Sequence, residues 1–217
     1  MNRPVVFSDF DGTITEKDVL MSIVQHFAPP IWKDIWNKIF TREITISEGV
    51  KQLFHLIPSS KKDEIVNWCL KNMKIREGFK DFLLFLKQKD IPFIVLSGGL
   101  DFYIHPLLES YRELIYNIYA NKALFDERYI KVEFIYKCNN VCKEDCGMCK
   151  PYIIEKYYKI FKPKIYIGDG ITDLTSASIS DIIFARDYLA KTLQSLKIKY
   201  FEYSSFIDIY QNLNKLI

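Results

Sequence analysis

Paired carboxylates near the N-terminus give the first indication of chemistry. The run Asp9-Phe10-Asp11-Gly12-Thr13 follows an apolar segment that is typical of a buried β-strand. Side chains at i and i+2 of a strand point the same way, so the two carboxylates leave the sheet together. One carboxylate can bind a cation and attack phosphorus, and the other can exchange protons with the leaving group and then with water. A polar turn is the plain alternative, and an EF-hand calcium loop fits poorly because its glycine comes later in the loop.

Three further polar signals lie beside predicted elements. Ser97-Gly98-Gly99 follows the apolar strand 93–96, and a hydroxyl with bare N–H groups at a strand-to-helix turn can cradle an anion. Gly168-Asp169-Gly170-Ile171-Thr172-Asp173 follows another apolar strand and supplies acidic oxygens that suit Mg²⁺. Lys150 precedes a proline at a predicted helix start and can neutralise phosphate charge. Each signal alone also fits an ordinary turn or a solvated lysine.

The elements that must position these residues follow from hydrophobic periodicity. Between residues 18 and 75 the apolar residues recur at helical spacing in four stretches, and Ser60-Lys61-Lys62-Asp63 fits a capping box that opens the fourth. After residue 76, amphipathic helices alternate with short apolar strands. The strands are predicted at 93–96, 164–167 and 182–185, with a half-exposed hairpin strand at 129–134.

This order predicts an α/β fold with two parts. Residues 1–17 and 76–217 are expected to form a parallel-sheet core, and residues 18–75 an inserted all-helical cap. In an open parallel sheet the carboxyl ends of the strands meet at one crevice. The polar signals are therefore expected to form a single site.

The bulk composition narrows the class of protein. The 217 residues include 49% hydrophobic and 26% charged residues with a net charge of +3, as expected for a globular protein without a nucleic-acid footprint. No stretch approaches the roughly 18 uncharged apolar residues of a membrane helix. Asp9 interrupts the N-terminal apolar run too early for a signal peptide. We expect a cytoplasmic protein that binds a small metabolite, with no nucleic-acid or membrane partner, and leave a homodimer open.

The motifs also occur in a recognisable order. Asp-x-Asp-Gly-Thr, then Ser, then Lys, then Gly-Asp-Gly-x-x-Asp extend over nearly the whole chain. This order resembles that of the haloacid dehalogenase-like phosphatases. The resemblance implies a Rossmann-like core, a helical cap that closes over small substrates, and Mg²⁺-dependent hydrolysis of a phosphate monoester through an aspartyl-phosphate intermediate.

The resemblance further implies a role for each matching residue. Asp9 corresponds to the nucleophile and Asp11 to the general acid and base, with a main-chain carbonyl that also contacts the metal. Asp169 corresponds to the third magnesium contact. Asp18, at the cap entrance, falls where phosphoserine phosphatases carry a substrate-selecting Glu. The remaining matches are the phosphate-binding Ser97, Gly98 and Lys150, and Thr13 and Asp173, which support the metal site.

Four segments point to one group within the family: residues 8–15, 27–30, 146–151 and 184–189. They are similar to the phosphatases of 2-hydroxy-3-keto-5-methylthiopentenyl-1-phosphate in methionine salvage. Gly170 departs from that group, in which we expect Ser. The alternatives are a phosphoserine phosphatase-like or another small alcohol or sugar phosphatase, and a non-enzymatic regulatory module that binds metal or phosphate.

Most of the cysteines lie close together in the sequence, at Cys138, Cys142, Cys146 and Cys149. Thiolates at this spacing can hold a tetrahedral structural Zn²⁺ beside Lys150, and free thiols or a disulfide are the alternatives. The last three also match the spacing of radical S-adenosylmethionine enzymes. Those enzymes need most of a barrel after the motif, and only 68 residues follow it here.

Overall fold

The computed structural model describes residues 3–137 and 145–217. Within these residues, seven strands form one sheet in the order β4-β3-β2-β1-β5-β6-β7. Neighbouring strands are parallel, except that β3 and β4 form an antiparallel hairpin. The strands are β1 (Val5–Ser8), β2 (Phe93–Leu100), β3 (Asn117–Leu124), β4 (Lys131–Glu133), β5 (Lys164–Gly168), β6 (Ile182–Ala185) and β7 (Phe201–Glu202).

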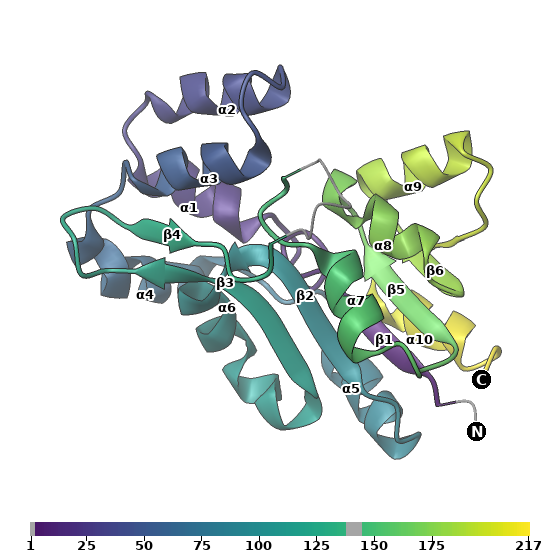
Figure 1. The fold of residues 1–217 in the computed structure, drawn as a ribbon. Helices are drawn as coiled ribbons and strands as arrows, with labels where there is room; N and C mark the ends of the chain where they lie inside the picture. Colours follow the sequence, from purple (N-terminus) through teal and green to yellow (C-terminus); the bar gives the residue numbers. More distant parts are fainter. Residues whose placement is uncertain (1–2, 138–144) are drawn as a thin grey trace.

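Strand β1 lies at the centre of the sheet because it is apolar on both faces. Val5 and Phe7 pack into one hydrophobic cluster, whereas Val6 packs into another on the opposite face. A strand that is buried on both faces needs helices on both sides. Figure 1 shows these two helical layers around the sheet.

The helices divide between the two faces according to their buried residues. The layer on the side of Val6 consists of α5 (Phe79–Gln88), α6 (Asp101–Leu108) and α10 (Phe206–Leu213). The opposite layer consists of α7 (Lys150–Tyr157), α8 (Leu174–Ser178) and α9 (Asp187–Ser195). The predicted α/β fold with a Rossmann-like parallel sheet is confirmed.

The predicted all-helical insertion lies between β1 and α5. It consists of α1 (Val19–Phe27), α2 (Trp32–Phe40), α3 (Ile46–Phe54) and α4 (Lys62–Asn72). Figure 1 shows α1, α2 and α3 grouped at one end of the sheet, beside β4. The segments that enter and leave the cap run side by side, because Thr15 and Ile75 form an antiparallel bridge. The division at residues 17/18 and 75/76 stays a prediction.

Two local predictions were wrong. The capping box at Ser60 does not form, because the 3-10 helix η1 (Ser59–Lys61) precedes α4 and the helix begins without a side-chain cap. The residues Ser97-Gly98-Gly99 are not a strand-to-helix turn, because β2 continues through them to Leu100. The register of β2 against β3 shifts between Leu96 and Leu100, so the strand is irregular at this point.

Two short 3-10 helices complete the described chain, η2 (Glu109–Leu114) and η3 (Ile171–Asp173). The helices of the described residues are too short and too polar for any of them to cross a bilayer.

Candidate active site

The predicted polar motifs meet at one edge of the sheet. Asp9 and Asp11 follow β1, and Asp169 follows β5, the strand beside it. Ser97 lies near the end of β2, on the other side of β1. Because parallel strands end at the same edge, residues far apart in sequence become neighbours there. The structure thus brings these residues together at one edge of the sheet, and their roles stay predictions.

A cluster of carboxylates forms the floor of the site. Asp9, Asp169 and Asp173 each offer an oxygen, and these oxygens all lie within 4.8 Å of one another. Burial and the neighbouring charge of Asp173 raise the pKa of Asp169 from 3.8 to about 6. Burial also raises the pKa of Asp9 well above its usual range. Burial therefore disfavours the ionised forms of Asp9 and Asp169, and a divalent Mg²⁺ ion, which prefers hard oxygen donors, would offset their charge.

Lys150 joins the two acidic motifs. Its Nζ lies 2.5 Å from Asp9 Oδ1 and 2.7 Å from Asp173 Oδ1, and the lysine is buried. Burial alone would lower the pKa of Lys150, but the charges of Asp173 and Asp9 outweigh it and hold the pKa well above its usual range. The ammonium group is therefore charged and fixes the orientation of the Asp9 carboxylate.

Asp173 belongs to the carboxylate cluster and also stabilises the turn that follows β5. Its Oδ2 accepts backbone N–H groups of Asp169 and Gly170, at 3.1 and 2.9 Å. Its Oδ1 accepts the Tyr166 hydroxyl at 2.6 Å in addition to Lys150. Gly168 leaves room for this arrangement, since a Cβ there would lie 2.7 Å from Asp173 Cγ. Asp173 thus holds the turn after β5 and the lysine in one network.

The Asp11 carboxylate lies apart from the cluster and faces the start of the cap. Its Oδ1 accepts the backbone N–H groups of Val19 and Leu20, at 3.1 and 3.3 Å. Its Oδ2 accepts hydroxyls of Ser97 and Tyr103, at 3.3 and 3.2 Å. Burial, followed by the charge of Asp18, raises the pKa of Asp11 to about 7. A carboxyl group with this pKa can both give and take a proton near neutral pH. The contact of its main-chain carbonyl with metal stays a prediction.

Two residues of the loop after β1, Gly12 and Thr13, lie against the Asp169 carboxylate. The Thr13 hydroxyl donates to Asp169 Oδ1 at 2.6 Å. Gly12 has φ +80°, and a Cβ there would lie 2.6 Å from Asp169 Oδ2. Both the left-handed backbone and the close approach require glycine at this position.

Sequence reasoning missed Arg76, which holds the loop after β1. The Arg76 Nε donates to the Thr13 carbonyl at 2.8 Å, and Nη2 donates to the Gly12 and Thr15 carbonyls at 2.6 and 3.0 Å. Its Nη1 reaches the Ser204 carbonyl at 3.2 Å. Arg76 is 7% exposed, so these charged hydrogen bonds are shielded from water. The sequence could not predict this role, because no motif spacing connects a single arginine to a loop more than sixty residues away.

The other predicted substrate-binding residues lie around Asp11. Ser97 is fully buried, and its hydroxyl also accepts the Gly99 N–H at 3.0 Å. Gly98 lines the main cavity, and its carbonyl accepts the Asn121 side chain at 2.9 Å. Asp18 lines the same cavity and caps helix α1, since its Oδ1 accepts the Met21 N–H at 2.8 Å.

This main cavity, of about 770 Å³, separates the core from the cap. The core contributes polar residues to it, among them Asp9, Asp11 and Asp169. The cap contributes an apolar wall together with the polar residues Asp18, Arg42, Glu43, Thr45 and Glu48. The apolar cap residues that line the cavity are Leu20, Met21, Trp36, Ile39, Phe40, Ile44, Ile46, Val50 and Leu53. A ligand with a polar head and an apolar tail fits this division.

A polar contact ties the cap to the loop that precedes Lys150. The Asp145 carboxylate accepts the Thr45 hydroxyl at 2.9 Å and also accepts the Ser47 hydroxyl. The Ser47 N–H donates to the Asp145 carbonyl at 3.1 Å. The first turn of α3 is therefore attached to the core beside the site.

The predicted zinc site falls partly outside the described residues, which do not include Cys138 and Cys142. Cys149 is buried, and the Cys146 thiol lies 3.4 Å from the Met148 carbonyl. Within residues 3–137 and 145–217, the group of side chains with metal-ligand spacing is the carboxylate cluster. The described part of the chain gives the zinc hypothesis no support.

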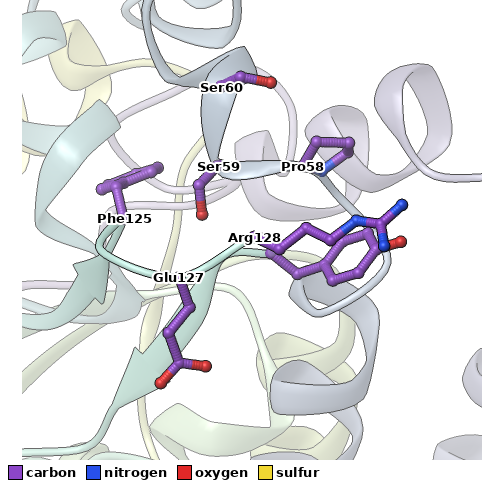
Figure 2. A pocket seen from close by; sticks show the side chains of 7 residues that line it. Pro58, Ser59, Ser60, Phe125, Glu127 and Arg128 are labelled. Atoms are coloured by element: carbon purple, nitrogen blue, oxygen red, sulfur yellow. The ribbon is translucent and has the colours of Figure 1, made fainter.

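A second cavity, of about 580 Å³, lies between the segment that joins α3 to α4 in the cap and the β3–β4 loop. Figure 2 shows Ser59 pointing toward this loop, between Phe125 and Arg128. None of the predicted catalytic residues lines it. The chemistry therefore belongs to the cavity between cap and core.

Comparison with known proteins agrees with this geometry. Residues 6–178 match the family model described as haloacid dehalogenase-like hydrolase. The 2-hydroxy-3-keto-5-methylthiopentenyl-1-phosphate phosphatase of Bacillus pumilus (strain SAFR-032) is 44% identical over 209 residues, which cover 96% of this chain and 90% of that protein. The phosphatase of the same name from Bacillus cytotoxicus is 40% identical over 98% of this chain and 96% of its own length.

Solved structures show the same fold at lower sequence identity. A phospho-aspartyl intermediate analogue of phosphoserine phosphatase superposes with a TM-score of 0.70 at 16% identity, covering 98% of this chain and 99% of the other. A substrate-bound phosphoserine phosphatase complex gives a TM-score of 0.70 at 17% identity, with 98% of each chain covered. At this identity the likeness concerns the fold.

Proposed function

The chain belongs to the haloacid dehalogenase-like hydrolase family and is a phosphoric monoester hydrolase, and we propose that its substrate is 2-hydroxy-3-keto-5-methylthiopentenyl-1-phosphate. The observation that carries this proposal is the cavity that joins buried carboxylates on the core to an apolar wall on the cap. The relatives that carry this substrate in their name support it, at 44% and 40% identity over nearly the whole chain.

In this proposal Asp9 is the nucleophile. Lys150 donates to its carboxylate at 2.5 Å and holds it in one orientation, as in-line attack on phosphorus requires. A bond forms between an Asp9 oxygen and phosphorus, and the bond from phosphorus to the ester oxygen breaks. The electron pair stays on that oxygen, which takes a proton from Asp11. The product alcohol leaves and the phosphoryl group remains on Asp9.

The second half of the reaction uses Asp11 as a base. Its carboxylate accepts a proton from water, whose oxygen attacks phosphorus while the bond to Asp9 breaks. Inorganic phosphate leaves, and both aspartates return to their starting state. The pKa of about 7 that burial gives to Asp11 suits a group that must serve as acid and then as base.

Two further sets of groups serve the substrate phosphate: oxygens that would hold Mg²⁺, and hydrogen-bond donors to the phosphate oxygens. Asp9 and Asp169 offer the side-chain oxygens that would hold Mg²⁺, with the main-chain carbonyl of Asp11 as the third contact. Thr13 supports Asp169, and Asp173 holds the turn that carries it. Bound Mg²⁺ supplies positive charge that offsets the charge of the phosphate. Ser97 and the backbone at Gly98 are the proposed phosphate donors.

The apolar wall supports a substrate with an apolar tail. The proposed substrate ends in a methylthio group, which has no hydrogen-bonding partner to satisfy and gains free energy when it leaves water. Trp36 and Phe40 on α2 line the cavity and are 42% and 79% exposed, so they are available to cover such a tail. Phosphoserine is the second candidate, because Asp18 lies in the cavity where a carboxylate could accept an ammonium group.

A substrate panel tests the proposal. Phosphate release is measured for the methylthiopentenyl phosphate, for phosphoserine and for simple sugar phosphates, each with Mg²⁺ and with EDTA. We expect Mg²⁺-dependent release with the highest kcat/KM on the methylthiopentenyl phosphate. A higher kcat/KM on phosphoserine would transfer the assignment to the second candidate, and release that is unchanged by EDTA would contradict the metal dependence.

A further inference from the structure

Tyr103, which the motifs do not include, reaches the predicted general acid from helix α6. Its side chain is fully buried, and its hydroxyl donates to Asp11 Oδ2 at 3.2 Å. A buried tyrosine hydroxyl needs a hydrogen-bond partner, and here that partner is a group of the active site. The contact links a helix of the core layer to the chemistry.

The two oxygens of Asp11 differ in their surroundings. Oδ1 accepts two backbone N–H groups, from Val19 and Leu20. Backbone N–H groups can only donate, so both lone pairs of Oδ1 stay engaged, whereas the two hydroxyls that contact Oδ2 can turn and accept a proton from it. The proton that Asp11 transfers is therefore carried on Oδ2, the oxygen that Tyr103 contacts.

Ser97 is the other side chain that donates to Oδ2, at 3.3 Å. A serine hydroxyl has one proton, so it donates to one acceptor at a time. When Ser97 donates to the phosphate of a substrate, it can no longer donate to Asp11. Tyr103 is then left as the side-chain donor that holds Oδ2.

Gly99 provides the space for this contact. A Cβ at position 99 would lie 2.0 Å from the Tyr103 hydroxyl oxygen and 2.6 Å from Asp11 Oδ2. Gly99 is not among the glycines with positive φ, so its backbone does not require glycine. The contact between Tyr103 and Asp11 is what excludes a larger residue at this position.

We propose that Tyr103 is a positioning residue that orients Asp11 Oδ2 toward the leaving oxygen of the substrate. This inference rests on the proposed function, in which Asp11 gives its proton to that oxygen as the phosphorus–oxygen bond breaks. Without the tyrosine hydroxyl, Oδ2 loses the donor that holds it while Ser97 binds phosphate, so it is placed less precisely and protonates the leaving oxygen less efficiently. The loss is greatest for a basic leaving group, which depends most on the proton.

The test is Tyr103→Phe, measured on aryl phosphates of similar shape whose phenols have pKa values from about 7 to about 10. We expect kcat/KM to fall about 10-fold or more for the most basic phenol and less than about 2-fold for the least basic one. The plot of log kcat/KM against leaving-group pKa is therefore steeper than for the wild type. Gly99→Ala, which displaces the same contact, is expected to steepen the plot as well.

Tyr158→Phe is the matched control. It removes another buried tyrosine hydroxyl, which pairs with Tyr119 at 3.1 Å instead of a site residue. Its plot is expected to keep the wild-type slope. An equal loss across the whole series in Tyr103→Phe, or no loss, would overturn the positioning role. If the wild type released phosphate from none of the esters, that result would contradict the proposed function itself, separately from the role of Tyr103.

Discussion

At the scale of single residues, the site concentrates negative charge that the protein alone does not neutralise. Burial raises the pKa of Asp9 well above its usual range, that of Asp11 to about 7 and that of Asp169 to about 6. Lys150 supplies one positive charge within hydrogen-bond distance of this group. A site of this kind favours either protons or a bound cation.

The first prediction concerns stability and pH in the absence of metal. A carboxyl group whose folded pKa exceeds its unfolded value binds protons more tightly in the folded state, so stability falls as pH rises between the two values. For Asp11 this window extends from 3.8 to about 7, and for Asp169 from 3.8 to about 6. We expect the Tm of the EDTA-treated protein to decrease by several degrees between pH 5 and pH 7.5, measured by differential scanning fluorimetry.

Added Mg²⁺ is expected to reverse this trend, because the ion binds the ionised carboxylates. The rise in Tm on adding Mg²⁺ is therefore larger at pH 7.5 than at pH 5. Asp169→Asn, which removes one ligand, is expected to reduce the rise at both pH values. A rise of equal size at the two pH values in the wild-type protein would contradict this electrostatic account.

The residues that sequence analysis predicted share one property: they belong to short motifs with fixed spacing at strand ends. Asp9, Asp11, Asp169 and Asp173 lie in such motifs. The structure clusters Asp9, Asp169 and Asp173 and places the Asp11 carboxylate beside Ser97. Tyr166 could not be predicted, because an aromatic residue within an apolar strand is expected to be ordinary core. Its role follows from its hydroxyl, which reaches Asp173 at 2.6 Å.

At the scale of elements, the loop after β1 is held from outside its own motif. Arg76 lies just after the cap and binds the carbonyls of Gly12, Thr13 and Thr15. It also binds Ser204, so the catalytic loop, the end of the cap and the C-terminal segment share one side chain. The planar guanidinium group supplies several donors in fixed directions, which an ammonium group cannot copy.

The second prediction is that Arg76→Lys destabilises the protein by about 2–3 kcal/mol, because buried carbonyls lose charged hydrogen bonds. We also expect kcat to decrease, since Gly12 and Thr13 support Asp169. Urea unfolding and steady-state kinetics measure the two effects. The control is Arg112→Lys on η2, an exposed residue, for which a change below about 0.5 kcal/mol is expected. A stability loss in Arg76→Lys no larger than in this control would be evidence against the anchoring role.

Most elements were predictable because their hydrophobic period is clear, as in the four cap helices and in strand β6. Their ends were less predictable. β2 extends past the apolar residues through Ser97 and the two glycines, because its pairing with β3 resumes at Leu100. The attachment of Asp145 to the first turn of α3 depends on tertiary contacts that no local pattern shows.

At the scale of the whole molecule, function depends on the cavity between cap and core. The core carries Asp9, Asp11 and Asp169 and the cap carries the apolar wall, so neither part alone encloses a substrate. The sequence predicted both parts and their order. It could not predict which cap residues face the cavity, because α1, α2 and α3 carry apolar residues that line it as well as apolar residues that pack into the core.

The third prediction tests the apolar wall. Phe40 is 79% exposed, so Phe40→Ala is expected to change the free energy of unfolding by less than about 0.5 kcal/mol. If Phe40 covers the methylthio tail, kcat/KM for the methylthiopentenyl phosphate decreases about 10-fold, whereas kcat/KM for p-nitrophenyl phosphate stays within about 2-fold. Leu70→Ala on α4, 52% exposed and outside the cavity lining, is the control and is expected to change neither value. Equal losses on both substrates would argue against a tail-binding wall.

The most direct test of the central claim is to find the residue that carries the phosphoryl group. The enzyme is quenched in acid during turnover of the methylthiopentenyl phosphate with Mg²⁺, digested, and analysed by mass spectrometry. We predict a phosphorylated peptide modified at Asp9, absent from Asp9→Asn, whose turnover is at least about 10⁴-fold slower. A phosphoryl group on another residue, or undiminished turnover by a pure preparation of Asp9→Asn, would contradict the account.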